Sequence, residues 1–138
     1  MDKTLDTVLL MLEGSTITLE IFCVTLALSL PLGLFAALGR LSRFRLLSRL
    51  LEIYIWIMRG TPLMLQLLFV YFALPMVGIL LPDIAAALLA FVLNYAAYFA
   101  EIFRSGIQAI PRGQFEAARA LGMSAPLTMR RIVLPQVL

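Results

Sequence analysis

The sequence contains no histidine and a single cysteine, Cys23. Histidine is the usual proton carrier near neutral pH, and structural zinc sites are built from histidine and cysteine. A disulfide needs two cysteines, so the chain cannot form one of its own. Charge is also scarce, because 14% of the residues are charged, against about 25% in soluble domains. These absences exclude zinc, disulfide and histidine chemistry within the chain and argue against a soluble domain.

Apolar sequence takes the place of these residues. Hydrophobic residues make up 62% of the 138 residues, and the mean hydropathy is +1.00. Three charge-free runs, 21–39, 60–82 and 84–100, are long enough or nearly so to cross about 30 Å of hydrocarbon. Each is expected to be a helix, because an open strand could not satisfy its backbone in lipid. The sequence thus predicts an all-α integral membrane protein with three spanning helices.

The segment before the first run, 4–13, is an amphipathic lead-in. Gly14, Ser15 and Thr16 offer a helix start after it. The first residues are mainly acidic, whereas a cleaved signal peptide begins with a basic region. We therefore expect the first spanning helix to remain in the protein.

The basic residues are grouped along the chain. Ten of the eleven are arginines, and they fall in two blocks, 40–59 and 104–131, each beside an apolar run. Loops rich in arginine and lysine remain in the cytoplasm. This predicts that both blocks are cytoplasmic, with the N-terminus and segment 75–83 outside. It also explains the net charge of +3 without a nucleic-acid partner.

Segment 44–58 has apolar residues at helical spacing, with arginines on another face. This pattern predicts a helix lying at the membrane interface before the chain turns inward. The turn is predicted at Arg59, Gly60, Thr61 and Pro62, with Thr61 as the N-cap and Pro62 as the first residue of the second span. This span is expected to run to about Leu74.

The third run carries a polar stripe at steps of four, three, four and three residues. Its members are Asn94, Tyr98, Glu101, Ser105 and Gln108. The opposite side carries alanines that are small enough for close helix packing. Polar groups in lipid are unfavourable, so the stripe should face protein or a water-filled path. Two interpretations stay open: Asn94, Tyr98 and Glu101 line a solute route, or they hold helices together, with Glu101 neutralised by Arg104.

The polar segment after this run, 101–135, predicts a helix, a break and a second helix. Pro111 and Gly113 should end the preceding helix. Gly122 follows a helix-forming stretch at the position where a C-terminal cap needs a positive φ. The first short helix should present a largely small, apolar face to a partner. That face comprises Phe115, Ala118, Leu121 and Gly122.

Within this segment, Glu116, Ala117 and Ala118 are followed after three residues by Gly122 and after nine more by the sequence Ile-Val-Leu-Pro. The spacing E-A-A-x3-G-x9-I-x-L-P resembles the signature loop of the membrane subunits of bacterial ABC importers. In that family the loop is cytoplasmic and docks into a groove on the ATP-hydrolysing subunit. The resemblance implies this role for Glu116, Ala117, Ala118, Leu121 and Gly122. The alternative is an amphipathic connector on the membrane surface.

A second stretch, RGTPLMLQLLFVYF at 59–72, is similar to the corresponding stretch in permeases for polar amino acids such as histidine, arginine, glutamine and glutamate. The residues carrying this similarity are Arg59, Gly60, Thr61, Pro62 and Gln66. The two stretches lie far apart in the sequence and agree with one another.

Together the resemblances imply a permease subunit that moves polar amino acids across the bacterial cytoplasmic membrane. The expected partners are a separate ATP-binding subunit, a second permease that is identical or similar, an external solute-binding protein and membrane lipid. No metal, cofactor or enzymatic role is expected. The family core has five spanning helices, so 1–138 is expected to be an incomplete transmembrane domain whose fourth span begins near residue 132.

Two other functions remain open from the sequence. One is a permease of the same superfamily for another small solute, and the other is a membrane scaffold without transport. A membrane-embedded enzyme is disfavoured, because the sequence offers no Ser/His pair, paired carboxylates or metal-ligand cluster.

Overall fold

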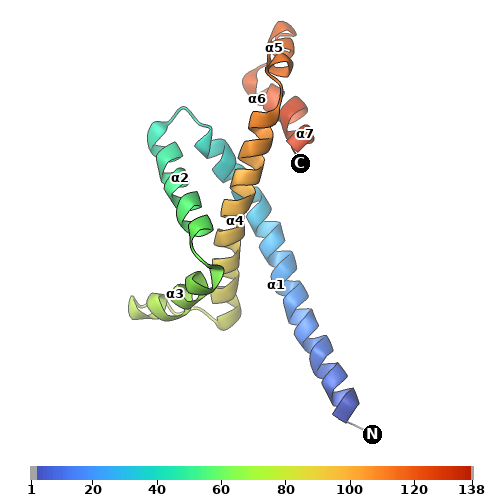
Figure 1. The fold of residues 1–138 in the computed structure, drawn as a ribbon, viewed down its shortest axis with the longest axis vertical. Helices are drawn as coiled ribbons and strands as arrows, with labels where there is room; N and C mark the ends of the chain where they lie inside the picture. The colour runs from blue at the N-terminus through green and yellow to red at the C-terminus, as the bar shows by residue number, and fades with distance from the viewer. Residues whose placement is uncertain (1–2, 138) are drawn as a thin grey trace.

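The computed structural model describes residues 3–137, which form helices joined by short turns. The helices are α1 (Lys3–Arg40), α2 (Arg45–Gly60), α3 (Leu63–Met76), α4 (Asp83–Ala109), α5 (Arg112–Ala120), α6 (Ala125–Thr128), the π-helix η1 (Met129–Val133) and α7 (Leu134–Val137). Figure 1 shows α1 crossing α4, α2 running beside α4, and α3 lying across the end of α2. The expected all-α architecture is confirmed.

The two long helices α1 and α4 form the centre of the fold. Both are long and apolar enough to cross a membrane. They approach closely because the contact faces carry small residues: Ala96, Ala97 and Ala100 of α4 are buried. Gly33 of α1 lies against them, and a Cβ atom at Gly33 would come 2.5 Å from the Cβ of Phe99. Close helix packing through small residues is typical of membrane helix pairs.

The expected start of the first spanning helix at Gly14 is wrong, because α1 is continuous from Lys3 to Arg40. The hydroxyls of Ser15, Thr16 and Thr18 each donate to the carbonyl four residues earlier. These side chains therefore bond within the helix instead of capping it. A glycine inside a helix costs only about 1 kcal/mol, which a helix of 38 residues tolerates.

The charge-free run 60–82 is not one helix, and the second span expected from Pro62 to about Leu74 corresponds to α3 (Leu63–Met76). α3 has 14 residues and is about 21 Å long at about 1.5 Å per residue, shorter than the hydrocarbon core. It meets α2 at a bend of 105°. The described residues thus contain two candidate spans, or three if the bent α2–α3 pair is counted as one span.

The expected interfacial helix corresponds to α2, and its apolar face packs on protein. Ile55 is 2% exposed, and Leu51, Tyr54 and Met58 pack against alanines of α1 and α4. The turn lies one residue later than expected: Thr61 caps the end of α2, and Pro62 is the N-cap of α3.

Beyond α4 the chain forms a compact helical end. Pro111 separates α4 from α5, whereas Gly113 lies inside α5 and does not break a helix. The run from α6 through α7 returns along α4, where Val133 is fully buried. A Cβ atom at Gly106 of α4 would lie 2.8 Å from a methyl carbon of Val137. The end of α4 is thus covered by the C-terminal helices.

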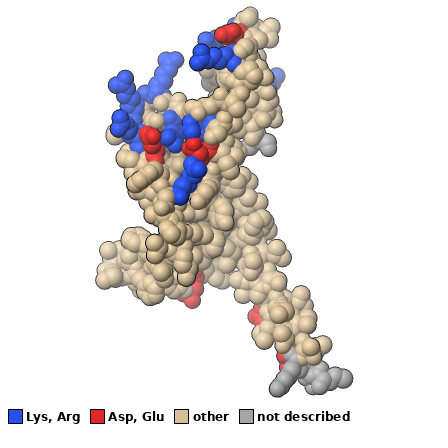
Figure 2. All heavy atoms as spheres, in the orientation of Figure 1, with Lys and Arg blue, Asp and Glu red and all other residues tan. Residues whose placement is uncertain are grey.

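Charged side chains are distributed unequally along the molecule. Figure 2 shows lysine and arginine gathered at the end that carries α5 and the α1–α2 connection. The opposite end, in the same view, shows mainly uncharged surface with a few acidic side chains. The molecule therefore has one basic end.

Candidate functional site

The first candidate site is the docking loop, which we define as residues 112–128. α5 ends in a Schellman motif: the N–H of Gly122 donates to the Arg119 carbonyl at 2.9 Å, and the N–H of Met123 donates to the Ala118 carbonyl at 3.0 Å. Gly122 has φ +72°, as expected for this cap. Ser124 is the N-cap of α6, and a proline follows in its first turn. The predicted helix–break–helix is confirmed.

The residues predicted to share one face of α5, Phe115, Ala118, Leu121 and Gly122, are not all exposed in the structure. Ala118 is 1% exposed and faces inward, and Phe115 is half-buried. Leu121 is 80% exposed, and Glu116, Ala117 and Gly122 are also exposed. The residues available to a partner are thus Glu116, Ala117, Leu121 and Gly122, whereas Ala118 supports the loop from within.

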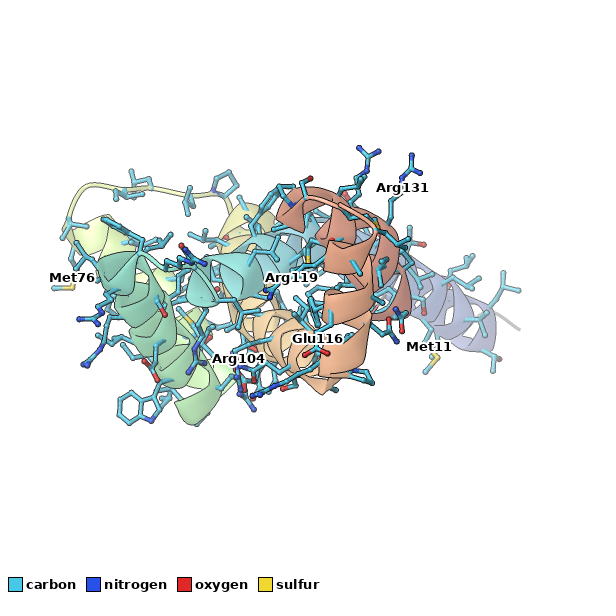
Figure 3. All side chains as sticks on the ribbon, turned by 90° about the horizontal axis from the view of Figure 1, so that it is seen from above. Met11, Met76, Arg104, Glu116, Arg119 and Arg131 are labelled. Carbon is cyan, nitrogen blue, oxygen red and sulfur yellow. The ribbon has the colours of Figure 1, made fainter. Side chains whose placement is uncertain are left out.

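Glu116 is the only carboxylate of the docking loop. None of the ion pairs within 4.0 Å in the described part of the chain includes it. Figure 3 shows Glu116 and Arg119 on α5, while Arg131 points away from them. The Glu116 side chain is therefore exposed and available to a cation from outside the chain.

The connection between the loop helices is fixed by side-chain amides. Gln114 of α5 and Gln136 of α7 exchange two hydrogen bonds, at 3.1 and 2.7 Å. The Thr128 hydroxyl donates to the Ser124 carbonyl at 3.0 Å. The Gln114–Gln136 bonds join α5 to α7, which packs on α4, whereas the Thr128 bond lies within α6.

The second candidate site is the bend cluster, defined as Met58, Thr61, Gln66 and Asn94. The Asn94 amide donates to the Met58 carbonyl and to Gln66 Oε1, each at 3.0 Å. Gln66 Nε2 donates to the Met58 carbonyl at 3.0 Å and to the Thr61 hydroxyl at 2.8 Å. The structure therefore joins the 59–72 stretch to the polar stripe, a pairing that sequence spacing did not predict.

The third candidate site is the arginine–glutamate cluster: Arg40, Glu52, Arg59, Glu101 and Arg104. Glu101 accepts hydrogen bonds from Arg104 and, at 3.1 Å, from Arg40. Arg59 lies 4.0 Å from Glu101, with its guanidinium 5.5 Å from the centre of the Tyr98 ring. Arg40 also pairs with Glu52 at 3.0 Å. The predicted Glu101–Arg104 pair is present, whereas the contributions of Arg40 and Glu52 were missed.

Two cavities adjoin these groups. A pocket of about 310 Å³ is lined by four members of the arginine–glutamate cluster together with Ile55, Trp56 and Gly60. A more apolar groove of about 480 Å³ lies between α1 and α4. Its lining includes the buried hydroxyls of Thr25 and Ser29, which have no hydrogen-bond partner among the described residues. Within residues 3–137 no three Cys, Asp or Glu side chains gather as metal ligands.

The comparison with known families identifies this architecture. Residues 29–138 match the family described as "Binding-protein-dependent transport system inner membrane component". The chain belongs to this family. The match includes α4, the bend cluster and the docking loop. The resemblance to membrane subunits of bacterial importers is thereby confirmed, as is the expected class of membrane transport component.

The chain is also similar to two curated proteins and to one solved structure. The chain is 44% identical to the probable amino-acid ABC transporter permease protein YckA of Bacillus subtilis (strain 168), over 91% of this chain and 55% of that protein. It is 43% identical to the arginine transport system permease protein ArtQ of the same organism, over 96% and 61%. A crystal structure of an amino acid ABC transporter with histidines matches with a TM-score of 0.79 and 37% identity, over 94% and 64%.

The chain therefore spans less than two thirds of the length of these relatives. The matched region contains both stretches that the sequence analysis singled out. It includes α2, α3, α4 and the docking loop.

Proposed function

We propose that this chain is part of a permease subunit of an ATP-driven importer of polar amino acids in the bacterial cytoplasmic membrane. The observation that carries the proposal is the docking loop. It presents Glu116, Leu121 and Gly122 at the basic end of a membrane-spanning fold. A rigid, exposed loop joined to a spanning helix suits the transmission of movement from a partner to the membrane.

The partner at the loop would be a separate ATP-binding subunit. Exposed Leu121 offers an apolar contact, and Glu116 offers a carboxylate for a basic group. A Cβ atom added at Gly122 would meet no other part of the fold within 4 Å, so a partner can approach the backbone closely on that side. ATP binding would close the ATPase pair, and α5 would pass this movement to α4 through α7.

A second permease subunit and an external solute-binding protein would complete the transporter. The family description itself refers to dependence on a binding protein. The basic end would face the cytoplasm, and the N-terminus would lie outside. Residues 1–138 would belong to the transmembrane domain of this permease, with its fourth span beginning near Ile132.

The proposed solute is a polar amino acid. The relative ArtQ is named for arginine transport, and the similar crystal structure is described as an amino acid ABC transporter with histidines. The 59–72 stretch independently pointed to the same class. Asn94, Tyr98 and Glu101 are proposed for the wall of the solute path, where Tyr98 is 42% exposed and Asn94 is 5% exposed. Tyr98 and Glu101 would face the path, with Asn94 behind them.

The direct test is uptake by the complete system. The full-length permease should be reconstituted in proteoliposomes with its ATPase and binding protein, and uptake measured for labelled arginine, glutamine, histidine and a sugar. ATP-dependent uptake of at least one polar amino acid and not of the sugar is expected. Uptake of the sugar alone would support a permease for another solute, and failure to co-purify any ATPase would support a membrane scaffold.

A further inference from the structure

The break between α2 and α3 leaves the last backbone carbonyls of α2 without helical donors, and the Met58 carbonyl is the one that side chains of α3 and α4 reach. In a continuous helix the N–H of residue 62 would donate to the carbonyl of Met58. Residue 62 is proline, which has no N–H. The last helical bond of α2 runs from the Thr61 N–H to the Ile57 carbonyl, at 3.1 Å. The Met58 carbonyl therefore needs another donor in an apolar setting.

Two side-chain amides supply that donor. Asn94 Nδ2 and Gln66 Nε2 each lie 3.0 Å from the Met58 carbonyl oxygen. Asn94 Nδ2 also donates to Gln66 Oε1 at 3.0 Å. An amide nitrogen has two N–H groups, so both donors of Asn94 are used inside the protein. A side chain bonded in this way has no free donor for a solute.

Neighbouring contacts hold the same end of α2 on α4. The Tyr54 hydroxyl donates to the Leu93 carbonyl at 2.5 Å. One turn after Asn94, the Tyr98 ring lies under the Arg59 guanidinium. Asn94 is thus the middle of three consecutive attachments between α2 and α4. It is the one placed at the break itself.

We propose that Asn94 is a positioning residue: its amide replaces the missing Pro62 donor and so fixes the 105° bend between α2 and α3. It acts from α4 on the backbone of another helix. The direction of α3 thereby depends on a side chain of α4. The C-terminal end of α4 is followed directly by the docking loop. A movement of α4 would alter the support of the bend.

The proposal can be tested by measuring the bend in the full-length permease in a lipid bilayer. Spin labels on cysteines at Leu46 of α2 and Phe72 of α3, in a Cys23→Ala background, report the distance between the two helices. Both positions are exposed, at 62% and 66%. We expect a narrow distance distribution in the parent protein. Asn94→Leu should broaden it toward longer distances and lower the folded yield several-fold, whereas Ser105→Ala, an exposed change on the same stripe, should do neither.

A second substitution separates this role from a general packing defect. Pro62→Ala restores a backbone N–H that can donate to the Met58 carbonyl. Combined with Asn94→Leu it should recover most of the lost yield, while the label distance lengthens because α2 and α3 form a straighter helix. A packing defect at Asn94 would not be rescued by a change on the other helix.

Gln66→Met offers a milder variant if Asn94→Leu cannot be recovered from membranes. It removes the second donor while Asn94 still bonds the carbonyl, so a smaller broadening of the same distance is expected. An unchanged distance distribution in Asn94→Leu, or in Gln66→Met where the former is not recovered, would overturn the proposal. So would loss of uptake in Asn94→Leu with normal yield and distance, which would make Asn94 a solute contact.

Discussion

Glu101 is the residue on which three helices converge. Its carboxylate accepts from Arg40 of α1 and Arg104 of α4, and it lies 4.0 Å from Arg59 of α2. The Glu101 side chain is 20% exposed, whereas that of Glu52 at the edge of the same cluster is 53% exposed. Removing one partner of a partly buried ion pair lowers the free energy of unfolding more than removing one partner of an exposed pair.

Removal of the Glu101 charge should therefore destabilise the fold more than removal of the Glu52 charge. Glu101→Gln leaves three guanidinium groups close together without their shared counter-charge. We expect a loss of about 1–3 kcal/mol, between the values for exposed and buried pairs. Glu52→Gln should cost less than about 1 kcal/mol. Denaturant unfolding of the purified permease measures both, and equal losses would contradict this account of the cluster.

Of the three stripe residues proposed for the solute path, Tyr98 is the exposed one, and its prediction concerns transport. Tyr98→Ala removes the ring beneath Arg59 and widens the proposed path. Solute preference or uptake should change while membrane abundance stays near that of the parent. Uptake of a panel of amino acids, normalised to permease abundance, is the measurement. Reduced abundance with unchanged transport per molecule would assign Tyr98 to helix packing.

At the scale of elements, the α1–α4 crossing determines the fold. Gly33 permits it, because a Cβ there would lie 2.5 Å from Phe99 Cβ and 3.0 Å from the Ala96 carbonyl oxygen. Gly14 lies in the same helix, and apart from the adjacent helix backbone nothing lies within 4 Å of its Cβ position. The two glycines therefore form a matched pair for testing the contact.

Gly33→Ala should separate the helices locally and destabilise the fold by about 1–3 kcal/mol, as overpacking does. Gly14→Ala should be neutral or stabilising, because alanine is the better helix former. Thermal unfolding in detergent compares the two variants. Similar thermal unfolding midpoints for Gly33→Ala and the parent protein would contradict the close contact of α1 with α4 at Gly33.

The sequence predicted the elements better than their arrangement. Apolar runs located α1 and α4, and Gly122 was correctly assigned to a positive-φ cap, since both depend on local physics. The turn between α2 and α3 was predicted at Arg59, Gly60, Thr61 and Pro62, and the structure has a 105° bend there. Its consequence for the Met58 carbonyl depends on Asn94, 36 residues from Met58 in the sequence. Spacing along one helix cannot predict such a pairing between helices.

At the scale of the whole molecule, the basic end suggests how the protein lies in the membrane. The arginines of the α1–α2 connection and of the docking loop gather at one end (Figure 2). Positively charged loops remain on the cytoplasmic side of bacterial membranes. The connection between α3 and α4 lies at the other end of α4 (Figure 1). The two connections should thus lie on opposite sides of the membrane.

This orientation can be measured by labelling single cysteines in intact cells. In a Cys23→Ala background, Leu80→Cys should react with a membrane-impermeant thiol reagent, and Ser42→Cys and Ser124→Cys should not until the cells are permeabilised. Leu80 is 80% exposed, and the other two residues are also exposed, so access within the chain is not limiting. The reverse labelling pattern would invert the proposed topology.

The central claim is that the docking loop couples an ATPase to transport. Its most direct measurement is ATP hydrolysis by the full-length transporter in proteoliposomes, with and without solute-loaded binding protein, for Glu116→Lys and Gly122→Val. Both variants should reach the membrane. The factor by which solute-loaded binding protein stimulates their ATP hydrolysis should fall about tenfold or more, which corresponds to about 1.4 kcal/mol of coupling free energy. Gly113→Ala, a helical glycine of α5 with open space around it, should retain stimulation. Normal solute-stimulated hydrolysis in both loop variants would contradict the account.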